Sequence, residues 1–284
     1  MDYNDIFNQA QTLNLYGRLI SLRRPIIMGV VNATPDSFFS SSRVKNDKEI
    51  IHKVNQMIEQ GATIIDLGGC STRPNAEFVS ENEELDRVLP IIKLLKHEFP
   101  LIIISIDTFR ARVASKALES GASMVNDISG GQLDEEMFSI ISDYKAPYIL
   151  THFGGTIDNF VQPVVYKNLI KDMLDYFEDK VNQLTQLGHR ELIIDLGFGF
   201  SKTVSQNYEV LQYLELFKIF NLPILVGLSR KSMIYKELNI KPEEALNGTT
   251  VLHTIALNKG AKILRVHDVK AAQEAIILCE KIIS

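Results

Sequence analysis

The stretch D-K-E-I-I-H-K-V-N-Q-M-I-E-Q-G-A-T-I-I-D-L-G, residues 47–68, contains one complete structural unit of this chain. Its first part, 47–60, repeats apolar residues every three or four positions, which predicts an amphipathic helix. Gly61 ends that helix, because glycine readily takes the left-handed conformation found just after a helix. The run 63–68 that follows is apolar without alternation, which is typical of a strand whose two faces are both buried.

The same kind of unit recurs along the chain. Short runs rich in Ile, Leu and Val are found at eight places: Pro25–Val31, Thr63–Gly68, Leu101–Asp107, Ala122–Asp127, Pro147–His152, Glu191–Asp195, Pro223–Leu228 and Ala261–His267. A Gly-Ala pair leads into three of these runs, beginning at Gly61, Gly121 and Gly260. Eight alternating strand and helix units predict an α/β fold with a single (β/α)8 TIM barrel. The competing doubly wound sheet would carry a G-x-G-x-x-G turn after its first strand, and the turn here is N-A-T-P-D-S.

The residues before Pro25 stand outside the eight units. Leu13–Leu22, with Tyr16-Gly17 at its centre, has the pattern of a short β-hairpin, which we expect to lie across the N-terminal mouth of the barrel. We therefore expect an N-terminal extension with the hairpin over 1–24 and the barrel over 25–284.

The composition excludes several classes of protein. Thirty Lys and Arg against 35 Asp and Glu give a net charge of −5, which argues against sequence-independent binding of nucleic acid. No apolar run approaches the roughly 18 residues that a membrane helix needs, and no secretory signal is evident at the N-terminus. The two cysteines, Cys70 and Cys279, form no C-x-x-C pair, which excludes a thiolate zinc site and fits a reducing compartment. We expect a cytoplasmic protein with neither nucleic-acid nor membrane partners.

Polar side chains stand where the predicted strands end, and in a barrel of parallel strands these ends meet at one mouth. They are Asn32, Asp66, Asp107, Asn126 with Asp127, His152, Asp195, Ser229 to Ser232, and Arg265 with His267. Any single acid among them could be a helix cap. The mixture of acids, amides and cations at all eight ends favours a ligand site instead.

The residue types indicate the ligand. Asp107, Asn126 and Asp195 can accept the N–H donors of a planar heterocycle with an amino-pyrimidinone edge, while Lys231 and Arg265 suit a phosphate or diphosphate.

The same mouth offers further candidates. His267 adds to the cations, and Ser232 stands near the start of a helix expected to begin around Arg230, where free backbone N–H groups favour a carboxylate. His152 closes a strand and is equally compatible with a core role and a functional one. Cys70 has no base beside it in the sequence.

Seven blocks carry a resemblance to a known family. They are I-M-G-V-V-N-A-T-P-D-S-F at 27–38, G-A-T-I-I-D-L-G-G-C-S-T-R-P at 61–74, S-I-D-T-F at 105–109, V-N-D-I-S-G-G at 125–131, D-L-G-F-G-F-S-K-T at 195–203, L-V-G-L-S-R-K-S at 225–232 and R-V-H-D-V at 265–269. In this order they resemble the signatures of the dihydropteroate synthase family. The resemblance runs from Pro25 essentially to the C-terminus.

The resemblance implies a transferase of folate biosynthesis that joins 6-hydroxymethyl-7,8-dihydropterin diphosphate to p-aminobenzoate. Mg²⁺ would be the cofactor, and the enzyme would be a homodimer and a sulfonamide target. By position, the pterin would be held by Asp107, Asn126, Asp195 and Lys231, and the diphosphate by Asn32, Thr72, Arg73, Arg265 and His267. Phe38, Pro74, Phe200 and Ser232 would bind the aminobenzoate. Asn32 would meet Mg²⁺, catalysis would depend on Asp107, Lys231, Asn32 and Arg73, and the loops Thr34–Ser42 and Cys70–Ala76 would close over the site.

The chain departs from the family pattern at a few positions. The family usually has Glu at Cys70, Pro at Leu196 and Gly at Ser201, and it has Met-His-Met where this chain has Thr151-His152-Phe153. Two other functions share the barrel and its pterin site: a methyltetrahydrofolate–corrinoid methyltransferase and a pterin-binding paralogue that has lost catalysis. The T-P-D-S and S-R-K-S segments argue against the first, and the retained cations argue against the second.

Overall fold

The structure is a computed structural model that describes residues 12–33, 43–70, 79–155 and 162–283. Within these ranges, parallel strands close into a barrel in the order β10-β3-β4-β5-β6-β7-β8-β9. The strands are β3 (Ile26–Asn32), β4 (Ala62–Gly68), β5 (Ile103–Asp107), β6 (Met124–Asp127), β7 (Tyr148–Thr151), β8 (Leu192–Asp195), β9 (Ile224–Val226) and β10 (Ile263–Val266). The predicted (β/α)8 barrel is confirmed.

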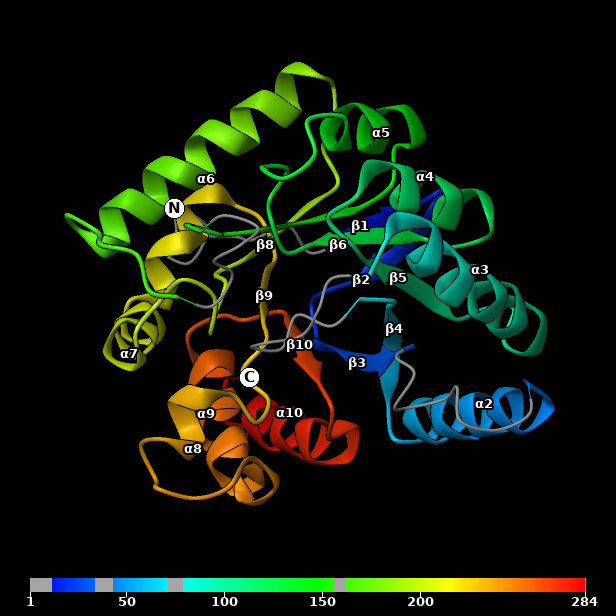
Figure 1. Cartoon of the computed structure of the whole chain (residues 1–284). Helices are drawn as coiled ribbons and strands as arrows, with labels where there is room; N and C mark the ends of the chain where they lie inside the picture. Colours follow the sequence, from blue (N-terminus) through cyan, green and yellow to red (C-terminus); the bar gives the residue numbers. More distant parts are fainter. Residues whose placement is uncertain (1–11, 34–42, 71–78, 156–161, 284) are drawn as a thin grey trace.

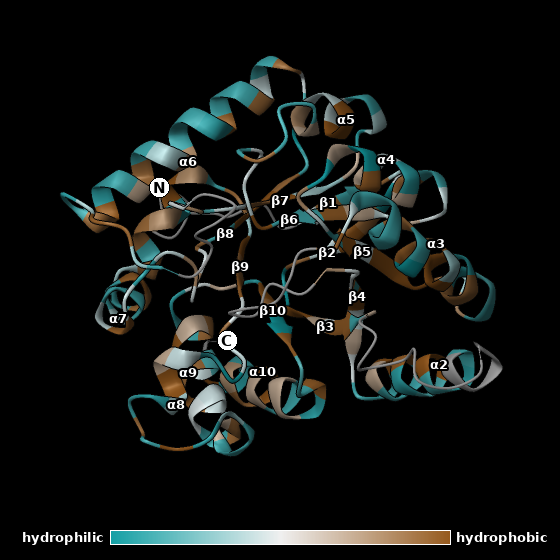
Figure 2. Ribbon diagram, in the orientation of Figure 1, coloured by the Kyte–Doolittle hydropathy of each residue, from teal (hydrophilic) through white to brown (hydrophobic). Residues whose placement is uncertain are grey.

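Helices form a ring around the barrel (Figure 1). They are α2 (Arg43–Glu59), α3 (Glu81–Glu98), α4 (Ala111–Glu119), α5 (Met137–Tyr144), α6 (Leu169–Gln186), α7 (Val204–Gln212), η3 (Leu214–Phe220), α8 (Ser232–Tyr235), η4 (Pro242–Glu244), α9 (Leu246–Asn258) and α10 (Val269–Ile283). Figure 2 shows hydrophobic strands and helices of mixed polarity, as expected when one side of each helix packs on the sheet. Among the helices of the described ranges, none is both long and apolar enough to cross a membrane.

The predicted N-terminal hairpin is confirmed. Its antiparallel strands are β1 (Thr12–Leu15) and β2 (Arg18–Ser21), joined by Tyr16-Gly17, where both residues have positive φ.

The hairpin covers the N-terminal mouth of the barrel, as expected. Its apolar side chains Leu13 and Leu15 belong to the same buried cluster as the interior residues of the barrel. Arg18 Nη1 donates to the carbonyl of Leu101 at 2.8 Å, just before β5. From β1, the backbone N–H of Asn14 donates to the carboxylate of Glu191, a residue that stands just before β8.

The three Gly-Ala pairs share one conformation. Gly61, Gly121 and Gly260 have φ values of 108°, 111° and 106°, which a residue with a side chain rarely adopts. Each glycine therefore ends a helix and turns the chain directly into the next strand.

We predict that Gly130→Ala lowers the free energy of unfolding by more than about 3 kcal/mol, through backbone strain and overpacking together. Gly130 has φ +60°, and a methyl group there would lie 2.0 Å from the Tyr176 hydroxyl oxygen and 2.6 Å from the Thr151 carbonyl oxygen. Gly188 also has positive φ but has open space around it, so Gly188→Ala should cost only about 1–2 kcal/mol. Urea denaturation measures both, and equal losses would contradict the prediction.

Candidate active site

The barrel interior is layered, because the side chains of a strand alternate between its two faces. The lower layer is apolar and takes one residue from each strand: Met28, Ile64, Ile103, Met124, Ile149, Ile193, Leu225 and Ile263. Two residues further along, the same faces carry Val30, Asp66, Ser105, Asn126, Thr151, Asp195, Gly227 and Arg265. We call this second set the polar layer, because most of its members carry polar side chains. The interior thus changes from apolar to polar toward the C-terminal mouth.

One register row of the sheet gathers predicted site residues. Asn32 pairs with Gly68, Gly68 with Asp107, and Asp107 with Asn126. A methyl group on Gly68 would lie 3.7 Å from both Asn32 Oδ1 and Asp107 Oδ2. An amide oxygen and a carboxylate oxygen therefore converge over this glycine.

Arg265 lies between two carboxylates. Its Nε donates to Asp66 Oδ2 at 2.6 Å, and its Nη2 donates to Asp107 Oδ2. Although burial opposes the charged form, these carboxylates raise the pKa of Arg265, so it stays a cation. Burial raises the pKa of Asp107 to about 7, even though Arg265 acts in the opposite direction. Burial thus disfavours the charged form of Asp107, and Arg265 favours it.

Asp66 also binds Asn126, whose Nδ2 donates to Asp66 Oδ2 at 3.0 Å. Within the described part of the chain, four buried atoms of the polar layer have no hydrogen-bond partner: Asp66 Oδ1, Ser105 Oγ, Asn126 Oδ1 and Thr151 Oγ1. They come from the consecutive strands β4 to β7. Leaving one such atom unpaired costs roughly 1–3 kcal/mol, so this group indicates a site for a ligand that brings N–H donors.

Asp195 and Lys231 are close enough to influence each other electrostatically. Asp195 Oδ1 accepts from the backbone N–H of Gly197 at 2.8 Å. Burial raises the pKa of Asp195, while the nearby Lys231 acts to lower it. Lys231 Nζ donates to the carbonyl of Phe198 and lies 4.8 Å from the ring centre of Phe200. Burial lowers the pKa of Lys231 to about 8, so its ammonium form still predominates at pH 7.

Arg230 pairs with Asp268, whereas its neighbour Lys231 contacts Phe198 and Phe200. The Nε and Nη2 of Arg230 donate to the two carboxylate oxygens of Asp268 at 2.8 and 2.9 Å. Arg230 has φ +54°, which no helix can include, so α8 begins at Ser232 with Lys231 as its N-cap. The helix thus begins two residues after Arg230, the position around which it was expected.

The segment after β8 carries Phe200 and bends sharply. Gly197, Gly199 and Ser201 all have positive φ, at 66°, 82° and 52°. His152, whose role the sequence leaves open, is buried beside this segment, and its Nδ1 lies 3.0 Å from Lys202 Nζ.

An apolar wall adjoins the charged groups. Phe109, Ile128 and Phe153 form a buried cluster on which Phe200 packs. Phe153 is one of the departures from the family pattern, and the structure accommodates its ring in this cluster.

The remaining predicted residues are less central or lie outside the described ranges. His267 is exposed, and its backbone N–H donates to Ser229 Oγ at 3.3 Å. Asp127 is used within its own turn, where it accepts from the Ser129 and Gly131 N–H groups and from the Tyr148 hydroxyl. Phe38, Thr72, Arg73 and Pro74 fall outside the described residues, as does most of the loops Thr34–Ser42 and Cys70–Ala76.

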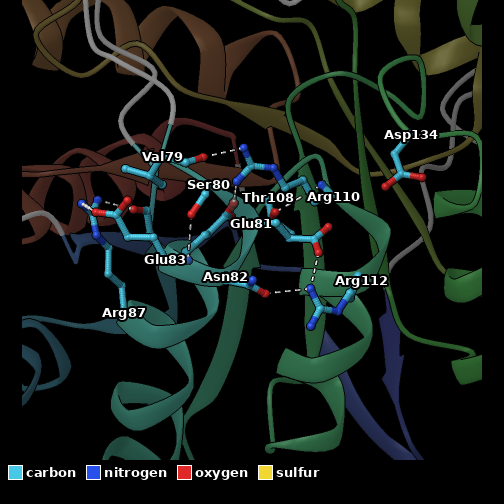
Figure 3. A network of polar contacts seen from close by, with 12 residues as sticks. Val79, Ser80, Glu81, Asn82, Glu83, Arg87, Thr108, Arg110, Arg112 and Asp134 are labelled. Atoms are coloured by element: carbon cyan, nitrogen blue, oxygen red, sulfur yellow. Dashed lines mark hydrogen bonds and ion pairs between the residues drawn. The ribbon is translucent and has the colours of Figure 1, made fainter.

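Two arginines bind backbone carbonyls on either side of residues 71–78, and Figure 3 shows Arg110 reaching Val79. Arg87 Nη1 donates to the carbonyl of Gly69 at 3.0 Å, and Arg110 Nη2 donates to the carbonyl of Val79 at 2.7 Å. Arg110 also pairs with the buried carboxylate of Glu84. The backbone at Gly69 and Val79 is therefore held by side chains from α3 and from the residue before α4.

The sequence places Asp66 among the polar strand ends at the mouth but gives it no individual role, and it does not single out Lys202. The signal for Asp66 is an acid in a run that is otherwise apolar. Lys202 has no such signal, because its burial follows from the bend of the segment before it.

Comparison with known proteins gives the family. The family model described as "Pterin binding enzyme" matches residues 28–267. A dihydropteroate synthase of Synechocystis sp. is 43% identical over 265 residues, which are 92% of this chain and 90% of that protein. A solved dihydropteroate synthase from Clostridium difficile, in the presence of pteroic acid, is 39% identical with a TM-score of 0.85, covering 92% of this chain and 97% of that one. The enzyme of Xanthomonas albilineans with 4-aminobenzoic acid is 31% identical with a TM-score of 0.88, covering 97% and 99%.

The family match begins at Met28, in the lower layer, and ends at His267, at the mouth. It therefore includes the whole polar layer, with Arg265 and its two carboxylates. The chain belongs to the pterin-binding enzyme family and, within it, to the dihydropteroate synthases.

Proposed function

We propose that the protein condenses 6-hydroxymethyl-7,8-dihydropterin diphosphate with p-aminobenzoate, giving 7,8-dihydropteroate and diphosphate. The observation that carries this proposal is the polar layer, where buried acceptors stand beside the cations Lys231 and Arg265. A dihydropterin supplies N–H donors along its amino-pyrimidinone edge, and its diphosphate supplies an anion. The ligands named for the two solved relatives, pteroic acid and 4-aminobenzoic acid, support the same assignment.

We assign the pterin to Asp107, Asn126, Asp195 and Lys231. Asn126 has its Nδ2 engaged by Asp66, so the unpaired Oδ1 is the atom that meets the ligand. Asp195 has its Oδ1 engaged by Gly197, which leaves Oδ2 for the ligand in the same way. Both side chains are held by the protein in orientations that present an acceptor.

We assign the diphosphate to Arg265, His267 and Asn32, together with Thr72 and Arg73. Arg265 is already paired through Nε and Nη2, but a guanidinium has five N–H donors and can bind a further anion.

The residues present fit Mg²⁺. The amide oxygen of Asn32, which lies over Gly68, is the kind of hard donor that Mg²⁺ prefers. Within the described ranges no three His, Cys, Asp or Glu side chains group as a metal site, so the substrate phosphates would supply further ligands, as is usual for Mg²⁺. When bound there, Mg²⁺ would neutralise charge on the diphosphate.

The chain's own groups suit a dissociative reaction. The bond between the pterin methylene carbon and the diphosphate oxygen breaks, which leaves a cation delocalised into the ring. The Asp107 carboxylate stabilises that positive charge, and Arg265 stabilises the departing diphosphate. The aminobenzoate nitrogen then attacks the methylene carbon and loses a proton.

We assign the second substrate to the part of the mouth beside the apolar wall. Phe200 and Ser232, with Phe38 and Pro74, would enclose the aminobenzoate ring and its carboxylate. Phe200 packs on the buried aromatic cluster and on Lys231, so it can form one wall.

We also propose a cytoplasmic homodimer. Cys70 and Cys279 are both free thiols, as expected in a reducing compartment. The neighbouring helices α9 and α10 expose large apolar side chains, among them Val251 and Leu278 at 51% and 67% exposure, which supports an interface there.

The proposed reaction is tested by incubating the purified protein with the pterin diphosphate, p-aminobenzoate and Mg²⁺, without any corrinoid partner. Formation of 7,8-dihydropteroate and diphosphate in equal amounts is the expected result. A folded protein that binds the pterin but forms no product would instead be an inactive paralogue.

We predict that kcat/KM falls about tenfold per pH unit below pH 7, because Asp107 acts as a carboxylate and burial raises its pKa to about 7. The sign follows from protonation, since a carboxyl group loses its charge as the pH drops through its pKa. Asp107→Asn should remove this dependence and lower kcat/KM by about 10²-fold or more. The ratio of wild-type to variant rates across pH cancels ionisation of the substrates, and a constant ratio would contradict the assignment.

We predict ordered binding, in which p-aminobenzoate binds weakly alone and about tenfold or more tightly with Mg²⁺ and diphosphate. Arg265→Ala should abolish this enhancement, because the cation that binds the diphosphate is lost. Calorimetric titration measures it, and Arg265→Lys, which keeps the charge but not the two-carboxylate contact, should be intermediate. Equal affinity with and without diphosphate would show that the aminobenzoate pocket is preformed.

We predict that Val251→Lys combined with Leu278→Lys gives a monomer, because each change buries an unpaired charge in the proposed interface. Light scattering after size exclusion gives the mass, with the wild-type protein expected at twice the chain mass. Leu101→Lys is the control, since Leu101 is 78% exposed and lies at the N-terminal mouth. A wild-type monomer would refute the dimer.

A further inference from the structure

Lys202 is a buried lysine that the proposed reaction does not use, and burial lowers its pKa to about 7. Its Nζ lies 3.0 Å from His152 Nδ1, 3.1 Å from the Gly197 carbonyl oxygen and 3.4 Å from the Phe200 carbonyl oxygen. The side chains of Lys202 and His152 are 5% and 3% exposed. An ammonium group has three N–H donors, so these three acceptors match its capacity.

The contacts of Lys202 span a bend that is costly to form. Ser201 has φ +52°, a conformation that costs roughly 1–2 kcal/mol for a residue with a side chain. Ser201 is one of the departures noted in the sequence, because the family usually has glycine there. Its buried hydroxyl also has no partner among the described residues.

Other contacts hold the bend as well, including contacts at its two ends. Asp195 Oδ1 accepts from the N–H of Gly197 at 2.8 Å, and the Ser201 carbonyl accepts from the N–H of Val164 at 3.2 Å. Asn207 Oδ1 accepts from the N–H of Gly199 at 2.7 Å, and Lys231 binds the carbonyl of Phe198. Lys202 binds the carbonyls of residues 197 and 200, one on each side.

His152 holds Lys202 in turn. Its ring packs edge-on against Tyr176, with centroids 4.9 Å apart, and its backbone N–H donates to the Asp195 carbonyl at 2.8 Å. The pair therefore connects the bend to the rigid barrel strands β7 and β8.

We propose that Lys202, supported by His152, is a positioning residue that holds the left-handed 197–201 bend, so that Phe200 stays beside Lys231 and forms a wall of the aminobenzoate site. This inference rests on the proposed function for the identity of the ligand. The Lys202–His152 contact, which we call the tether, is needed because the left-handed conformation of Ser201 disfavours the bend.

The test uses Lys202→Met, which removes the donors but keeps the aliphatic chain. We expect KM for p-aminobenzoate to rise about tenfold, while KM for the pterin diphosphate changes less than about twofold. Lys171→Met is the matched control, because Lys171 is an exposed lysine on α6 that pairs only with surface acids.

A rescue experiment separates positioning from general damage. Adding Ser201→Gly to Lys202→Met should restore most of the KM, because glycine adopts the left-handed conformation without strain. If Lys202→Met had only made the bend more flexible, glycine at position 201 would make it more flexible still, and the KM for p-aminobenzoate would rise further. That outcome, or a normal KM in Lys202→Met, would overturn the proposal.

Amide hydrogen exchange of peptides covering 197–203 gives a readout independent of catalysis. Exchange should be faster in Lys202→Met and slow again in the double variant. If the wild-type protein makes no dihydropteroate, the proposed function fails. The exchange experiment is independent of that result, because unchanged exchange in Lys202→Met refutes the tether by itself. If Lys202→Met does not fold, His152→Phe is the second variant, because it removes the Nδ1 acceptor while keeping a ring. We expect His152→Phe to raise the KM for p-aminobenzoate and the exchange rates of 197–203. If His152→Phe raises neither, the tether is refuted.

Discussion

The ion pairs of Arg265 with Asp66 and Asp107 are the interaction on which the barrel interior depends. Asp66 is completely buried, and a buried carboxylate without a partner costs several kcal/mol. Arg265 offsets this cost, and Asp66 in turn fixes Asn126. Because Asp66 and Arg265 are 199 residues apart, the pair forms only when β10 closes the barrel against β3. Closure of the fold and assembly of the site are therefore the same event.

The sequence predicted the fold because the fold depends on local pattern. Uninterrupted apolar runs mark strands buried on both faces, and the glycines at 61, 121 and 260 mark helix ends through their positive φ. The strand-end positions of Asn32, Asp107, Asn126 and Asp195 could be predicted in the same way, since parallel strands bring these ends together. Their roles toward a ligand are a proposal from the family resemblance.

Other features were hidden because they depend on contacts between distant segments. Asp107 looks like an isolated acid in sequence, whereas Arg265, 158 residues later, is bound to it. The start of α8 depends on the left-handed conformation of Arg230, whose side chain pairs with Asp268. Lys202 is buried only because the glycine-rich segment bends back over it. No periodicity records any of these three arrangements.

Burial acts on the ionisable groups of the site in one consistent direction, toward neutrality. It raises the pKa of the acids Asp107 and Asp195 and lowers that of Lys231. The N–H donors of a pterin stabilise an ionised acid, and its carbonyl oxygen stabilises an ionised lysine. The pterin ring therefore favours the charges that burial disfavours, on the two acids and on Lys231. Binding and ionisation are coupled as a result, and these charges are strongest when the pterin is in place.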